Sequence, residues 1–401
     1  MHRHQHTVVR RAYSAEYGRR NTEYELLMRS RPIVALDIGS TKVACAIGAS
    51  SSQGGSFQLT GGSLVPYPFF LETWLGDPLL VSQTIEQALD SAGAGSPGEV
   101  AVAMASPMLS SEKVQVSIPL ADEPIVVRTK DLQRLQERAL DQALGIDREA
   151  LVVERLSCSG NGFESVSDPR GLSATRLSGT FHIVTMPIAL RQRLIQILES
   201  AGLEMTHLFY SLSATAAAFD EGSHPHRMLL IDLGGLSTQV GLFVEGRLRS
   251  SVSLAWGGLT LAFELSQLKH LTMEQAVSLS LEGCTSPDEN LRRCLDPHLE
   301  VLSRSIQQFL HGQTRPDGVY LSGRAALMDG IVEWVEKTVG LNPTIYRPAH
   351  AQAMSGLSQQ VGMSSALGVL NLLACQGSSV RSPWVVNRLL ERTRAILTEY
   401  F

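Results

Sequence analysis

A pattern that occurs twice constrains the fold of this chain more than any other feature. Residues 31–48 read RPIVALDIGSTKVACAIG, an apolar run that ends at Asp37 and continues through a polar turn into a second apolar run. Residues 228–243 read MLLIDLGGLSTQVGLF and repeat this arrangement around Asp232. Short apolar runs of this length predict buried strands. The repeat therefore predicts two strand–turn–strand hairpins, in two similar halves that face one ligand.

The residue types in the first turn suit a phosphate group. Gly39 lets backbone N–H groups approach phosphate oxygens, and Ser40 and Thr41 can donate hydrogen bonds. Lys42 adds a positive charge, and Asp37 can hold a hydrated Mg²⁺ through water. One copy alone is equally compatible with an ordinary hairpin that has a polar turn, because short motifs often match by chance. The second copy favours the phosphate site.

A third block, GVYLSGRAA at residues 318–326, is a buried strand that runs into a glycine turn. In this order the three blocks resemble the phosphate-1, phosphate-2 and adenosine motifs of the actin/Hsp70/sugar-kinase superfamily. The resemblance implies an α/β, actin-like two-lobed fold with two RNase H-like halves that binds ATP and Mg²⁺. Asp37 and Asp232 would reach the metal through water. The nucleotide-binding residues that it implies are Asp37, Gly39, Ser40, Thr41, Lys42, Asp232, Gly234, Gly235, Thr238, Gly257, Gly258 and Gly323.

Composition limits the other function classes. The 401 residues are 44% apolar and 18% charged, with a net charge of −5, so electrostatics gives no reason to expect a nucleic-acid partner. The five cysteines are dispersed and include no CxxC pair, which is typical of reduced cytoplasmic thiols rather than disulfides or a zinc site. No apolar run reaches the roughly 18–20 residues of a membrane-spanning helix. The sequence also has no secretory apolar region, so export is not expected.

A second motif narrows the resemblance. Residues 168–177, DPRGLSATRL, precede HIVT at residues 182–185. Together they resemble the DP-x-G-(M/L)-S-G-x-R-L…HIVT block of FtsA, the actin-like bacterial cell-division family. Sugar kinases, Hsp70 and actin itself lack this block, and FtsA carries it in an extra subdomain called 1C. The resemblance covers roughly residues 28–401 and implies an FtsA-type 1C insertion.

The resemblance also implies how the chain divides. Residues 1–31 are a basic extension, interpreted either as a disordered tail or as a mis-assigned start with translation beginning at Met28; a membrane or partner arm is the other alternative. The remaining parts are 32–111 and 187–227 (subdomain 1A), 112–186 (1C), 228–258 and 317–350 (2A), 259–316 (a shortened 2B), 351–375 (return to 1A), 376–383 (linker) and 384–401 (amphipathic helix). Within these parts, apolar residues at helical spacing predict continuous helices over 259–282 and 325–339, and a third helix that opens with Thr129 as its N-cap.

The last eighteen residues, WVVNRLLERTRAILTEYF, have helical amphipathic spacing. The side opposite the apolar face carries charged residues, which fits a helix lying in a bilayer interface; these are Arg388, Glu391, Arg392 and Glu399. A helix docked on the protein's own core or on a partner is the alternative. FtsA ends in such a membrane-targeting helix, and the resemblance favours membrane binding. The membrane-binding residues predicted are Trp384, Val385, Val386, Leu389, Leu390, Ile396, Leu397, Tyr400 and Phe401.

The resemblance implies a function that the residues alone do not. It predicts a protein that binds ATP and polymerises with itself on the inner face of the bacterial cell membrane at the division site. Its partners would be the bilayer surface, the C-terminal tail of the tubulin-like protein FtsZ through 2B, and later divisome proteins through 1C. A PilM-like cytoplasmic adaptor for type IV pili is an alternative, and a superfamily kinase is a weaker one.

Several positions depart from the family pattern. Leu236 stands where the family has a third Gly and Gln239 where it has Asp, while Arg324 replaces the second Gly of the third motif. The ribose-contacting Glu and Lys of the family fall on Val277 and Ser280. These departures predict nucleotide binding with slow or absent ATP hydrolysis, and they identify no catalytic residue.

Overall fold

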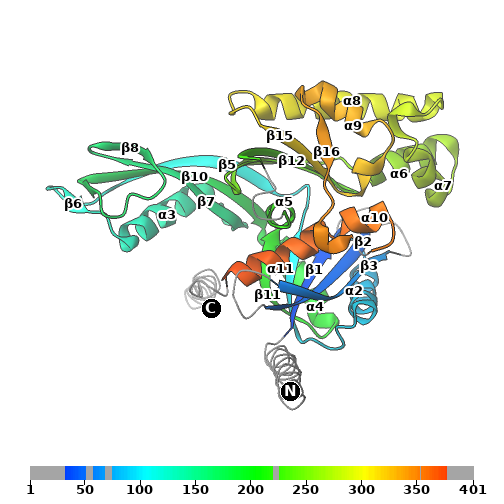
Figure 1. Cartoon of the computed structure of the whole chain (residues 1–401), viewed down its shortest axis with the longest axis horizontal. Helices are drawn as coiled ribbons and strands as arrows, with labels where there is room; N and C mark the ends of the chain where they lie inside the picture. The colour runs from blue at the N-terminus through cyan, green and yellow to red at the C-terminus, as the bar shows by residue number, and fades with distance from the viewer. Residues whose placement is uncertain (1–31, 51–56, 68–74, 220–224, 353, 377–401) are drawn as a thin grey trace, which may run out of the picture.

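The computed structural model describes residues 32–50, 57–67, 75–219, 225–352 and 354–376, which form two lobes and an inserted module (Figure 1). The predictions made for residues 1–31, for 377–383 of the linker and for the helix at 384–401 lie outside the described residues. Among the described helices, none combines the length and apolar character that a membrane span requires.

The sheet of the first lobe has the strand order β11-β4-β1-β2-β3. Strands β1, β2 and β3 form an antiparallel meander, whereas β4 and β11 run parallel to β1. Apolar side chains alternate between its faces, with α2 and α4 covering one and α11, beside α5, the other. The bounds are β1 Ile33–Ile38, β2 Lys42–Ser50, β3 Phe57–Pro66, α2 Pro78–Ala92, β4 Glu99–Met104, α4 Ile188–Ser200, β11 Glu204–Tyr210, α5 Ser211–Ala217 and α11 Ser364–Gln376.

The second lobe repeats this topology, with the order β14-β13-β12-β15-β16. Again three strands form a meander and two run parallel to its first strand. The prediction of a two-lobed actin-like fold with two similar halves is confirmed. The bounds are β12 Arg227–Leu233, β13 Thr238–Val244, β14 Arg247–Leu254, α6 Gly258–Lys269, α7 Met273–Ser280, η1 Gly283–Thr285, α8 Glu289–Leu310, β15 Gly318–Ser322, η2 Arg324–Leu327, α9 Ile331–Val339 and β16 Pro343–Ile345. After β16, η3 Ala349–Ala351 and α10 Leu357–Gly362 lead back to the first lobe and α11.

Two predicted helices are wrong in their continuity. The helix expected over 259–282 is broken at His270, whose φ of +53° ends α6 in the left-handed region. Thr272 then caps α7, because its side chain accepts from the N–H of Gln275 and the Gln275 side chain bonds back. The helix expected over 325–339 starts as a 3₁₀ turn, and α9 begins only after Gly330, with φ +78°.

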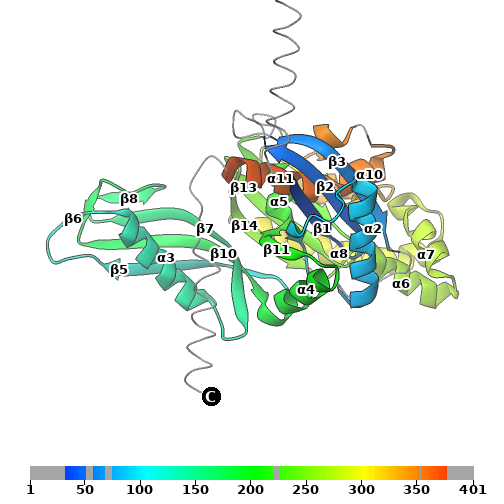
Figure 2. The same cartoon turned by 90° about the horizontal axis from the view of Figure 1, so that it is seen from below.

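The inserted module lies between β4 and α4 in the chain and projects away from both lobes (Figure 2). Its sheet has the order β5-β10-β7-β8, and α3 packs against β5 and β10. The cap predicted for α3 at Thr129 is wrong, since Arg128 holds that position and its N–H bonds to Asp131 at 3.0 Å. The bounds are β5 Ser110–Pro119, β6 Ile125–Val126, α3 Thr129–Ala143, β7 Arg148–Gly160, β8 Phe163–Val166, β9 Ser173–Ala174 and β10 Arg176–Pro187.

Polar contacts join this module to β14 of the second lobe. Arg249 donates from Nη1 to the carbonyl oxygen of Leu156 at 2.9 Å, and Arg247 donates from Nη2 to Glu154 Oε2 at 3.0 Å. The module therefore contacts the second lobe although its chain connections are to the first.

Candidate nucleotide site

The first hairpin is closed by its own backbone. The N–H of Gly39 donates to the carbonyl of Lys42 at 3.0 Å, and the Tyr67 hydroxyl donates to the carbonyl of Gly39 at 3.2 Å. Asp37 and Lys42 form an ion pair within the hairpin, and they are only 8% and 6% exposed. The lysine charge is thus already partnered by a carboxylate.

The second hairpin has the same geometry. The N–H of Gly234 donates to the carbonyl of Ser237 at 3.0 Å, the same three-residue spacing as in the first hairpin. Thr238, fully buried, donates from Oγ1 to the carbonyl of Trp256 at 2.9 Å. In this alignment of the two halves, Gly235 corresponds to Ser40 and Leu236 to Thr41.

The tips of the two hairpins touch. The N–H of Leu236 donates to Ser40 Oγ at 3.1 Å. A Cβ on Gly235 would lie 2.6 Å from Ser40 Oγ and 2.5 Å from Thr41 Cγ2. Only glycine fits at Gly235 without a shift, since real Cβ atoms essentially never approach so closely.

Three further glycines allow backbone segments to meet behind the second hairpin. A Cβ on Gly257 would lie 2.4 Å from the carbonyl oxygen of Gly235, and Gly258 donates to the carbonyl of Gly234 at 3.0 Å. Gly323 has φ +79°, and its Cβ would lie 2.7 Å from Asp232 Oδ1. The third motif and the GG turn therefore converge on the hairpin that carries Asp232.

The electrostatics of the site centre on two carboxylates. Burial, followed by the charge of Asp37, raises the pKa of Asp232 to about 6, although a hydrogen bond from Ser322 and the charge of Lys42 act in the opposite direction. Two carboxylates beside one ammonium leave excess negative charge, which a hydrated divalent cation would offset. Within the described ranges, no group of three or more His, Cys, Asp or Glu residues could hold a metal directly. The carboxylate pair is compatible with metal contact through water, and that contact remains a prediction.

The hairpin tips also fit a phosphate group. The backbone N–H groups of Ser40, Thr41 and Gly235 donate to no acceptor in the described part of the chain, and they lie at adjoining tips. Backbone N–H groups in adjoining turns can bind an anion where they face one position. The structure therefore brings the predicted residues of all three motifs together; the assignment of each to nucleotide remains a prediction.

At Val277 and Ser280, where the family has a Glu and a Lys that contact the ribose, this chain has no charged side chain. Ser280 is buried, and its hydroxyl donates to the carbonyl of Val277 at 2.8 Å within α7. Arg324 is partly buried, which lowers the pKa of its guanidinium, and its Nε donates to Ser358 Oγ at 3.1 Å. Contacts to a nucleotide would thus be concentrated at the phosphates.

Sequence reasoning missed the residues that surround Gln239. Its side-chain oxygen accepts from the Tyr210 hydroxyl at 2.9 Å, and its Nε2 donates to the carbonyl of Ser106 at 3.4 Å. Tyr210 and Ser106 belong to the first lobe, and no local pattern connects them to β13. The one available signal was the replacement of an expected Asp by an amide.

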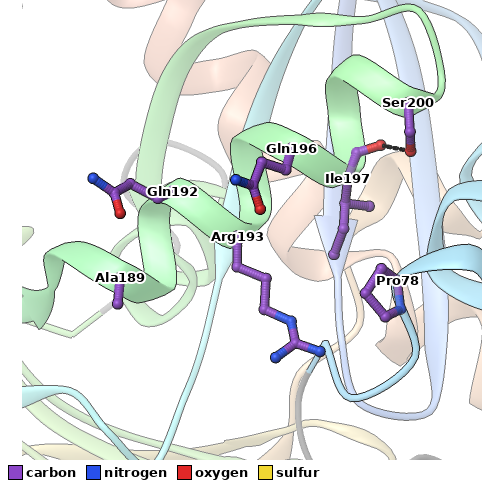
Figure 3. Close-up of a pocket in the computed structure, with 7 residues that line it drawn as sticks. All are labelled: Pro78, Ala189, Gln192, Arg193, Gln196, Ile197 and Ser200. Atoms are coloured by element: carbon purple, nitrogen blue, oxygen red, sulfur yellow. Dashed lines mark hydrogen bonds between the residues drawn. The ribbon is translucent and has the colours of Figure 1, made fainter.

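A separate hollow of about 390 Å³ lies on the outer face of the first lobe (Figure 3). Its one charged lining residue is Arg193, which donates to the carbonyl of Gly76 at 3.2 Å. The hollow lies along α4 rather than at the hairpins, and we assign it no role. It is lined by Pro78, Ala189, Gln192, Arg193, Gln196, Ile197 and Ser200.

The chain is similar to known proteins both in sequence and in structure. Residues 108–185 match the family of SHS2 domains inserted in FtsA. The chain is 22% identical over 334 residues to the cell division protein FtsA of Streptococcus pneumoniae, covering 75% of this chain and 73% of that protein. It is 22% identical over 370 residues to FtsA of Pseudomonas aeruginosa, covering 84% and 88%. Among solved structures, a chain of the PilM–PilN type IV pilus biogenesis complex has a TM-score of 0.66 at 17% identity, covering 86% of this chain and 98% of that one.

Proposed function

Because this chain is a divergent FtsA-like, actin-fold protein of cell division, we propose that it tethers FtsZ filaments to the cytoplasmic membrane. In this proposal it binds ATP with Mg²⁺ at the two hairpins, assembles with itself on the membrane, and recruits later divisome proteins through the inserted module. It acts in the bacterial cytoplasm, at the division site.

The observation that carries the proposal is the inserted module at residues 108–185. It matches the SHS2 domain found in FtsA, and it interrupts the first lobe between β4 and α4. A superfamily kinase has no evident use for such an insertion. We assign the module to subdomain 1C and the helical segment α6–α8 to a shortened 2B, which would bind the FtsZ tail.

Membrane attachment would come from the amphipathic pattern at residues 384–401. Three arginines against two glutamates give this segment only modest basicity, so a single copy should bind reversibly. Self-assembly would strengthen attachment through multivalency.

Nucleotide turnover should be slow or absent. The buried side chain of Gln239 is an amide, and it cannot accept a proton from an attacking water as a carboxylate would. The phosphate groups would be held by the tips of the two hairpins, and a bound Mg²⁺ would offset the negative charge of Asp37 and Asp232 through water. Clear Mg²⁺-dependent hydrolysis of ATP by the purified protein would contradict this part of the proposal.

Sedimentation with anionic liposomes tests the tether directly. The full chain is compared with a variant truncated after Ser382, with and without ATP and Mg²⁺. The tether requires that the full chain pellets with the liposomes and that the truncated chain stays in the supernatant. An FtsZ tail peptide is then added to the liposome-bound protein, where retention supports the second half of the proposal.

The structural likeness to the PilM–PilN complex keeps a pilus adaptor as the second candidate. In this alternative the chain would not need membrane binding by residues 384–401. If neither version of the chain pellets under any condition, the adaptor becomes the preferred function.

A further inference from the structure

Two residues of the second hairpin, Leu236 and Gln239, contribute to the contacts between the two lobes. At Leu236 the backbone N–H donates to Ser40 Oγ at 3.1 Å, and the partly buried side chain packs against a core cluster whose members come from both lobes. A glycine here, as the family has, would keep the hydrogen bond but lose the apolar contact. Leu236 thus adds apolar contact to a cluster that the two lobes share.

Gln239 connects the lobes through both ends of its amide. The oxygen accepts from Tyr210 in the first lobe and from Ser253 in the second. The nitrogen donates to the carbonyl of Ser106 in the first lobe and to Ser237 Oγ in the second, at 3.2 Å. All of its polar atoms are therefore partnered although the residue is fully buried.

An aspartate could not replace this amide. A carboxylate has no N–H to donate to Ser106 or Ser237. It would also place a charge beside the buried hydroxyl of Tyr210, where burial is costly unless a cation compensates it. Gln239 therefore suits an interface that stays closed, and a carboxylate suits a site where a cation enters.

The two lobes remain in close contact beyond these residues. A Cβ on Gly235 would clash with Thr41, and a Cβ on Gly241 would lie 2.5 Å from Cδ2 of Leu212 on α5. The interface is close-packed from the hairpin tips to the strand behind them. Close packing on this scale favours a discrete closed arrangement over a graded one.

We propose that Leu236 and Gln239 lock the two lobes closed without nucleotide, Gln239 acting as a positioning residue between Tyr210 and Ser106. The inference rests on the proposed nucleotide site, and it changes what a nucleotide would do there. A nucleotide can shift the lobe equilibrium only through its preference for the closed arrangement over the open one. Under this lock the closed arrangement is already dominant before nucleotide arrives, so ATP should bind with little further closure.

Hydrogen exchange of the full chain tests the lock. Two variants test the lock: Tyr210→Phe removes the hydroxyl that bonds to Gln239 across the cleft, and Leu236→Ala removes most of the side chain that packs in the shared cluster. Exchange is read on the opposite side of the cleft: at β13 for Tyr210→Phe, and at residues 39–43 for Leu236→Ala. A change there does not arise from the altered residue's own peptide. Ser253→Ala is the matched control, because it removes a hydrogen bond to the same oxygen of Gln239 from within the second lobe.

The lock predicts that ATP with Mg²⁺ changes the hydrogen-exchange rate of the unaltered chain by less than about twofold at β13 and at residues 39–43. Each cleft variant should exchange there about tenfold faster or more, and the control should behave as the unaltered chain. Two results would overturn the lock: variants no faster than the control, or an unaltered chain that ATP protects about tenfold. Equilibrium dialysis with ATP is run in parallel, so that a failure to bind nucleotide is distinguished from a failure of the lock.

Discussion

The imidazole Nε2 of His182 lies 3.0 Å from the Oγ atom of Ser251, and this contact joins the inserted module to the second lobe. His182 is on β10 and Ser251 on β14, strands that belong to different sheets. Both side chains are buried, at 2% and 7% exposure. Movement of the second lobe relative to the module would therefore expose a histidine that is neutral in this arrangement.

This burial predicts a loss of stability in mild acid. Burial, with the charge of Lys113, lowers the pKa of His182 to about 4 from 6.5. Between pH 6.5 and pH 4 the unfolded chain binds a proton at His182 and the folded chain does not. The stability that neutral His182 contributes is therefore fully present above pH 6.5 and is lost as pH falls toward 4. The loss amounts to about 3 kcal/mol of unfolding free energy.

Denaturant unfolding between pH 4 and pH 7 measures this effect, with His182→Gln as the comparison. The glutamine keeps a polar group near Ser251 but does not titrate, so its unfolding free energy should fall less steeply with acid. Parallel curves for the two proteins would show that His182 is not the responsible group.

Asp232 should act in the opposite direction. Its pKa is raised to about 6 from 3.8, so the folded chain keeps a proton that the unfolded chain has lost. Stability from this group therefore decreases as pH rises from about 4 to 6, by up to about 3 kcal/mol. Asp232→Asn should remove the dependence and make the protein more stable at pH 7 without nucleotide.

The same Asp232→Asn variant also probes the metal. Because a divalent cation favours the ionised carboxylate, Mg²⁺ with ATP should raise the melting temperature of the unaltered protein more than that of the variant. Equal shifts in the two proteins would mean that Asp232 does not contribute to metal binding. Melting is followed at pH 7, where the carboxylate is ionised.

Gly323 provides a test of the glycine-lined approach to Asp232. Its φ is +79°, and a Cβ would lie 2.2 Å from the carbonyl oxygen of Leu233. Gly93, at the end of α2, has the same φ of +79° but no atom within 4 Å of a Cβ. Gly93→Ala should therefore cost about 1 kcal/mol for the left-handed conformation alone.

Gly323→Ala should cost at least about 2 kcal/mol more than its control. Gly323 has ψ 154°, a region that is essentially restricted to glycine, whereas Gly93 has ψ 24°, and the backbone at Gly323 must also move away from Leu233. The two unfolding free energies are compared by denaturant titration. Similar costs would show that the turn after β15 yields easily and that close approach at Gly323 is not required.

Much of the site could be predicted because its parts are local in sequence. Asp37 and Lys42 lie in one hairpin, so the alternation of the strands and the residues of the turn were enough to predict it. The second hairpin followed the same pattern, and the agreement of the two halves identified the fold. The ends of helices were harder to predict. Helix α6 ends at His270, which has a positive φ, whereas the usual sequence signal for such an end is a glycine.

Contacts between distant segments could not be predicted from any local pattern. Tyr210 reaches Gln239 across the cleft from another sheet, and Ser251 meets His182 although nearly seventy residues separate them. Such pairs depend on how the lobes and the module pack, which periodicity does not describe. The replacement of Asp by Gln239 marked the position but not its partners.

The arginines of β14 test whether the module is held to the second lobe by a few buried bonds or by many weak ones. Arg249 donates to the carbonyl of Leu156 in a partly buried position, whereas the side chain of Arg247 is 43% exposed in its pair with Glu154. Hydrogen bonds from a charged donor are worth about 1.5–3 kcal/mol when shielded, and exposed ion pairs less than about 1 kcal/mol.

Arg249→Met should therefore speed hydrogen exchange across β14 and β7 about tenfold, while Arg247→Met should leave it nearly unchanged. If the two variants behave alike, docking of the module does not depend on burial of the Arg249 bond.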